Sequence, residues 1–173
     1  MKSPSLVALK QELNLMPPAE LVKICLQLAK YKKENKELLA YLLFDSNYEP
    51  EFVARVKAEI EMSFGELNRN TLYFAKKGIR KVLKTVNRYA RYSGLKRTEV
   101  DLRIHFCANL CRSGIPVVPG TATGNIFDGQ LLKIRKLIAG LHEDLQHDYN
   151  EEIRELLRQG HCKAETQLWK SLR

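Results

Sequence analysis

The stretch KKGIRKVLKTVNRYARYSGLKR, residues 76–97, has the pattern of an amphipathic helix with one strongly basic face. Counted from just before this stretch, apolar residues recur every three or four positions and share one side of a helix with 3.6 residues per turn. They are Leu72, Ala75, Ile79, Val82, Leu83, Val86 and Ala90. This apolar side predicts a helix that packs against other helices, and Ser93-Gly94 predicts its C-terminal cap.

The opposite side of the same helix gathers the basic residues. We expect the anion-binding residues of the chain to be Lys77, Arg80, Lys81, Lys84, Arg88, Arg91 and Tyr92. Tyr73 and Phe74 also lie near this face, where aromatic rings can stack on unpaired bases, but both fit a hydrophobic core equally well. Like charges three or four residues apart on an exposed helix cost about 0.2 to 0.5 kcal/mol per pair, so an anionic partner would stabilise the helix.

The net charge of the protein is concentrated in this one segment. The chain has 173 residues and a formal net charge of +9. Residues 67–98 contain ten Lys or Arg and no Asp or Glu, while the rest of the chain contains 19 basic and 20 acidic residues. The chain outside this segment is therefore close to neutral.

Helical periodicity continues through almost all of the remaining sequence. It predicts an all-α fold in which about seven to nine antiparallel helices form a single domain over residues 1–173. Serial helix pairs of roughly 40 residues are loosely similar to HEAT or armadillo stacking, although no diagnostic motif of those families is present. The apolar residues Ile115 to Val118 are too few to found a sheet.

Several helix boundaries are predicted from capping residues. Ser3 with Pro4 predicts the start of the first helix, Thr98 the start of the helix after the basic one, and Asn125 or Asp128 the start of the next. The polar run YKKENKE leaves open whether residues 19–45 form one helix or two, and we favour a turn there. An acidic helix is predicted over residues 143–159, followed by a short one that ends near Trp169.

The spacing of the cysteines and histidines gives little support for a metal or catalytic site. Cys107 and Cys111 share the apolar face of their helix, whereas His105 points away from it, which favours buried structural cysteines over a metal site. On the acidic helix, His142 and His147 are five residues apart and cannot ligate one zinc ion as an i,i+4 pair does.

Composition narrows the protein class. With no signal peptide or apolar run long enough to span a bilayer, the sequence predicts a cytoplasmic protein without membrane insertion, and its four cysteines are expected to be reduced. The loop GIPVVPGTATG, residues 114–124, lacks the Lys-Ser/Thr end of a P-loop. We expect no metal, no cofactor and no catalytic residues.

Three functions remain open. The preferred one is a non-catalytic helical binding module that uses residues 76–97 to contact an anionic partner, most concretely a nucleic acid backbone. The alternative is a protein interaction scaffold, contacting an acidic protein or with the basic helix paired to the acidic helix 143–159. The third, a metal-dependent helical-bundle enzyme, would rest on Asp144, His147 and Asp148. The sequence leaves the oligomeric state open.

Overall fold

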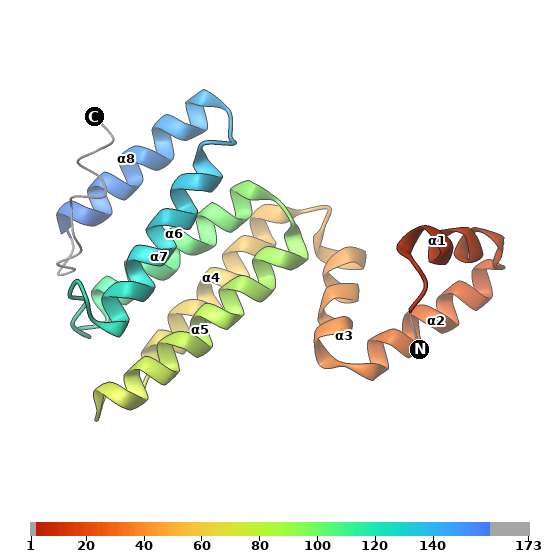
Figure 1. Cartoon of the computed structure of the whole chain (residues 1–173), viewed down its shortest axis with the longest axis horizontal. Helices are drawn as coiled ribbons and strands as arrows, with labels where there is room; N and C mark the ends of the chain where they lie inside the picture. The colour runs from red at the N-terminus through yellow and green to blue at the C-terminus, as the bar shows by residue number, and fades with distance from the viewer. Residues whose placement is uncertain (1–2, 160–173) are drawn as a thin grey trace. The chain divides into compact units, whose positions relative to one another are not determined.

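The computed structural model describes residues 3–159, which form eight α-helices and one π-helical turn without any strand in that range (Figure 1). The all-α prediction is therefore confirmed. The elements are α1 (Leu6–Leu15), α2 (Pro18–Tyr31), α3 (Lys33–Ala40), the π-helical turn η1 (Tyr41–Asp45), α4 (Glu49–Gly65), α5 (Leu72–Ser93), α6 (Lys96–Arg112), α7 (Ala122–Ile138) and α8 (Glu143–Gln159). The helix predicted near Trp169 lies outside the described residues.

Contacts along the chain form two compact units, Met1–Asn47 and Tyr48–Arg173. The first unit contains α1, α2, α3 and η1, and the second contains α4 to α8. The single domain over residues 1–173 stays a prediction, as does HEAT-like or armadillo-like stacking.

In the first unit, residues 19–45 are divided by a turn, as the sequence favoured. Lys32 adopts an extended backbone (φ −142°, ψ 143°) between α2 and α3. The Asn35 side-chain amide donates a hydrogen bond of 2.8 Å to the Leu28 carbonyl oxygen, which satisfies one of the free carbonyls at the end of α2. α1 begins later than predicted, because Ser5 and not Ser3 caps it by accepting from the Ala8 amide at 3.2 Å.

The second unit is organised around α6, which packs against α4, α5 and α7 (Figure 1). Because neighbours cover α6 on several sides, its buried residues are not confined to one stripe. Leu102, Phe106 and Leu110 are fully buried, and the Phe106 ring lies 5.5 Å from the Phe64 ring of α4. The core of this unit is therefore built on both faces of a single central helix.

A buried charge joins three of these helices. Arg103 of α6 is only 4% exposed, and its guanidinium donates hydrogen bonds to Glu99 one turn earlier, to Asn87 of α5 and to Gln130 of α7. A buried guanidinium is strongly destabilising unless it is paired and hydrogen-bonded. The position of α5 beside α6 and α7 is thus linked to the satisfaction of this one side chain.

The corner between α5 and α6 corrects two predictions. Gly94 has φ +66° and caps α5 in the left-handed conformation, as predicted, so the helix ends at Ser93. α6 starts at Lys96, so Thr98 is not its cap: the Thr98 hydroxyl donates to the Glu49 carboxylate of α4 at 2.6 Å instead. The basic segment 76–97 is therefore not one helix, since Lys96 and Arg97 belong to α6.

The start of α7 is also earlier than predicted. Thr121 caps the helix by accepting from the Gly124 amide at 3.1 Å, and its own hydroxyl donates to the Val118 carbonyl oxygen at 2.6 Å. Asn125 and Asp128 consequently lie inside α7. This first turn presses close to the preceding loop, because a Cβ placed on Gly124 would lie 2.1 Å from the Val118 oxygen.

This close approach predicts that Gly124→Ala destabilises the second unit. The new methyl group would have to push away a backbone carbonyl, and overpacking of this kind typically costs about 1 to 3 kcal/mol. Gly129→Ala is the matched control, since it lies in the same helix and a Cβ there meets nothing within 4 Å. Urea unfolding should show a lower free energy of unfolding for Gly124→Ala and an unchanged or higher one for Gly129→Ala; equal values for both variants would contradict the close contact.

Candidate nucleic-acid interface

The basic face of α5 consists of six side chains, and the structure exposes most of them. Lys77, Arg80, Lys81, Lys84 and Arg91 are exposed, while Arg88 is half-buried. On the other side of the helix Ile79, Val82 and Val86 are buried in the core. The helix is therefore anchored by one face while five of its cations lie at the surface.

Arg88 differs from the other five bases because it contacts α4. Its guanidinium lies 3.7 Å from a Glu59 carboxylate oxygen and 4.7 Å from the centre of the Tyr89 ring. The Tyr89 hydroxyl donates to the other Glu59 oxygen at 2.7 Å. Arg88 was predicted as an anion-binding residue, and here it also supports the packing of α5 on α4.

Tyr92, the last predicted binding residue, belongs to a row of aromatic rings. It is half-buried, and its ring meets the Tyr89 ring edge-on at 5.8 Å. Tyr89 in turn meets Phe52 of α4 at 5.8 Å. This geometry is typical of aromatic packing between helices, so the half-buried ring of Tyr92 offers less surface to a ligand than the exposed lysines do.

Tyr73 and Phe74, which the sequence left open, are surface residues. Their side chains are 70% and 47% exposed, and their rings meet edge-on at 5.5 Å. Thr71 caps the helix just before them by accepting from the Phe74 amide at 3.3 Å. The signal that could have placed them outside the core is their position in the first turn of α5, directly after its Thr71 cap and before the first buried residue, Ala75.

The acidic side chains of α8 are also exposed, while Tyr149 and Ile153 of this helix are buried and the helix contacts α7. Its ion pairs join residues of α8 or of the segment just before it, namely Arg154 with Glu151, Arg158 with Glu155 and His142 with Asp144. None of these three ion pairs, nor the one between Arg88 and Glu59, joins α8 to the basic face of α5. The predicted pairing between the two helices is therefore not seen among these ion pairs.

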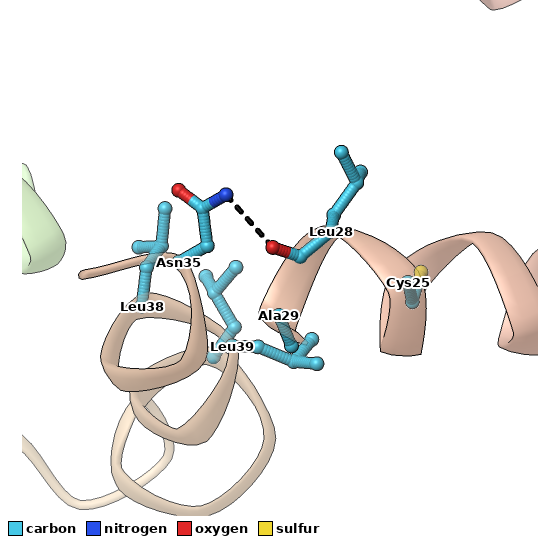
Figure 2. A pocket seen from close by; sticks show the side chains of 7 residues that line it. Cys25, Leu28, Ala29, Asn35, Leu38 and Leu39 are labelled. Carbon is cyan, nitrogen blue, oxygen red and sulfur yellow. Dashed lines mark hydrogen bonds between the residues drawn. The ribbon is translucent and has the colours of Figure 1, made fainter. Parts of the chain in front are cut away.

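A small apolar pocket lies in the first unit, between α2 and α3. Its volume is about 340 Å³, and it is lined by Leu42 of η1 and by the six residues that Figure 2 labels, Cys25, Leu28, Ala29, Asn35, Leu38 and Leu39. The Asn35 amide lies at its edge and donates to the Leu28 carbonyl oxygen, as the dashed line marks. The lining contains no charged side chain, so the pocket offers little to orient a polar ligand.

The candidate metal and catalytic residues do not converge. The part of the chain that the structure describes contains no group of three or more His, Cys, Asp or Glu side chains placed to hold a metal ion. Cys107 is a buried free thiol whose pKa is raised by burial. Cys111 is disulfide-bonded, so the expectation of four reduced cysteines is wrong for this residue. Asp144, His147 and Asp148 are exposed on α8.

No helix within the described range is long and apolar enough to cross a membrane. Comparison of the chain with protein-family models, curated proteins and solved structures finds no match. Function must therefore be inferred from the chain's own surfaces, of which the basic face of α5 has the most distinctive chemistry.

The half-buried His105 predicts a pH dependence of stability. Burial is the main cause that lowers its pKa below 6.5; Lys57 and Arg112 lower it further, and Glu61, 3.2 Å away, raises it. Because the unfolded chain then binds this proton more readily than the folded one, His105 should lower the free energy of unfolding as pH falls below about 6.5.

Urea unfolding at about pH 7.5 and pH 5.5 tests this linkage. His105→Gln should lose less stability on acidification than the natural protein. His142→Gln makes the same substitution at an exposed histidine and is the control for the loss of an imidazole as such. The linkage fails if His105→Gln and the natural protein lose equal stability between the two pH values.

Proposed function

We propose that the chain is a non-catalytic helical binding module whose basic face of α5 contacts the phosphate backbone of a nucleic acid. The observation that carries this proposal is the run of five exposed cations on a helix whose opposite face is buried. They are Lys77, Arg80, Lys81, Lys84 and Arg91. No acidic residue lies in residues 67–98 to neutralise them locally.

The length of the basic face suits a nucleic acid backbone. Lys77 and Arg91 are separated by a rise of about 21 Å along the helix. Successive phosphates of one strand advance by about 3.4 Å in a duplex, so the face spans the advance of about six phosphates. Several lysines and arginines can therefore contact one strand at the same time.

Binding would also relieve repulsion within α5. Lys77, Arg80, Lys81 and Lys84 form four pairs of like charges at spacings of three or four residues. Each such pair destabilises an exposed helix by about 0.2 to 0.5 kcal/mol. Phosphates placed along the face would remove this repulsion and release condensed counterions, which is the main source of affinity in backbone binding.

The kind of recognition follows from the same chemistry. Lysines and arginines that contact phosphates fix the position of a nucleic acid but do not distinguish its base sequence. Asn87 lies between Lys84 and Arg91, but it is half-buried and its side-chain oxygen accepts from Arg103 of α6, so it is poorly placed to pair with an adenine edge. We therefore expect affinity that depends strongly on salt and weakly on base sequence.

An acidic protein remains the second candidate partner. Such a protein would contact the same five cations through its own carboxylates. A measurement of nucleic-acid binding therefore distinguishes the two functions.

Neutralisation of three lysines tests the proposal. Lys77, Lys81 and Lys84 are exposed, without a salt bridge among the described residues, so their joint replacement by Gln should leave the fold intact. Arg88 is left in place because it contacts Glu59. The measurement is fluorescence anisotropy with labelled DNA and RNA between about 50 and 200 mM salt. For the natural protein we expect log affinity to fall with log salt with a slope of about −3 to −5. In the triple variant the magnitude of this slope should be smaller by about 2 to 3.

The matched control replaces Lys10, Lys23 and Lys36 of the first unit by Gln, which changes the net charge equally. All three are exposed. This control should bind with the natural affinity and slope. Equal losses in the two triple variants would show that net charge alone causes the binding, and no binding by the natural protein at low salt would direct the search to an acidic protein.

A further inference from the structure

An exposed aromatic ring continues the line of cations along α5. Taking Tyr73 as position i, Lys77, Arg80, Lys84 and Arg91 follow at i+4, i+7, i+11 and i+18. In a helix of 3.6 residues per turn these four positions lie within about 40° of Tyr73 around the axis. Tyr73 is therefore part of the same surface as the basic face.

The exposure of this ring is not required by the packing of α5. Tyr73 is 70% exposed, and Leu72 and Phe74 beside it are 58% and 47% exposed. Successive helix residues point about 100° apart, so these three side chains spread around the first turn, and the two whose rings meet, Tyr73 and Phe74, form a small exposed aromatic patch. Since the buried stripe of α5 begins at Ala75, the patch lies just beyond the core.

The ring also has neighbours that define its position. Phe74 meets it edge-on, with an angle of 73° between the ring planes. Thr71 caps the helix immediately before the pair, so the backbone that carries both rings is hydrogen-bonded from its first turn. Lys77 lies one helical turn, about 6 Å, further along.

These features distinguish between two forms of nucleic acid. In a duplex the bases are stacked on each other and are not available to a protein ring, whereas unpaired bases stack readily on exposed aromatic side chains. A nucleotide whose base stacks on Tyr73 would have its neighbouring phosphates beside Lys77 and Arg80. Replacing such a stacking residue by alanine typically lowers affinity by about 5-fold to 150-fold.

We propose that the basic face of α5 and Tyr73 together form a binding surface for single-stranded nucleic acid, in which the ring stacks on an unpaired base. This inference rests on the proposed function and adds the class of ligand to it. Phe74 is a positioning residue that supports the ring, and the five exposed cations bind the backbone on its C-terminal side.

Fluorescence anisotropy of the full chain tests this ligand class, using a labelled oligothymidine and a labelled duplex, each of about 20 nucleotides per strand. We expect the natural protein to bind the single strand at least about tenfold more tightly than the duplex. Tyr73→Ala should remove most of this preference without changing duplex affinity, because the cations remain. Tyr73→Phe should restore it, because the ring is kept.

Tyr31→Ala is the control, since Tyr31 is a similarly exposed tyrosine of α2, and it should bind as the natural protein does. Circular dichroism should show the same helical content in all variants. If the natural protein binds duplex and single strand equally, or if Tyr73→Ala keeps the preference while the triple lysine variant loses binding, the stacking role is wrong and the backbone-binding function stands. If the natural protein binds neither oligonucleotide, both proposals fail.

Discussion

Burial of α6 among α4, α5 and α7 is the constraint on which the rest of the second unit depends. Leu102, Phe106 and Leu110 have no exposed surface, so the neighbouring helices must stay in contact with α6 for its apolar residues to remain out of water. Arg103 adds a polar requirement, because a different packing would leave its guanidinium buried without Asn87 and Gln130. Apolar burial thus stabilises the unit, and the hydrogen bonds of Arg103 link α6 to α5 and α7 within it.

The same constraint explains how α5 can carry so much charge. Ile79, Val82 and Val86 are buried, so the helix does not depend on its outer face for stability. Repulsion among cations on that outer face is small beside the free energy of burying several aliphatic side chains, each of which contributes about 1.5 to 3 kcal/mol. The outer residues of α5 are therefore free to serve binding.

Periodicity predicted α5 well because its apolar residues recur regularly and Gly94 supplies a distinct end signal. Two helix starts were predicted wrongly because several residues nearby have side chains that can cap a helix. Thr98 could cap α6, but its hydroxyl donates to Glu49 of α4 instead. At the start of α7 the cap is Thr121, and not Asn125 or Asp128. The helical wheel placed six cations on one face but could not show that Glu59, from another helix, would contact Arg88. The helical wheel also could not show whether Tyr73 is buried or exposed, because that depends on which neighbouring helices cover the first turn of α5.

The concentration of charge in residues 67–98 also has a kinetic consequence. A chain that is nearly neutral elsewhere and strongly positive along one helix has a large electric dipole moment, and a polyanion approaching it experiences a torque as well as an attraction. Encounters are then oriented before contact, and such steering raises association rates most at low ionic strength. The placement of the cations on one anchored helix would therefore determine how quickly an anionic partner is found, in addition to how tightly it is held.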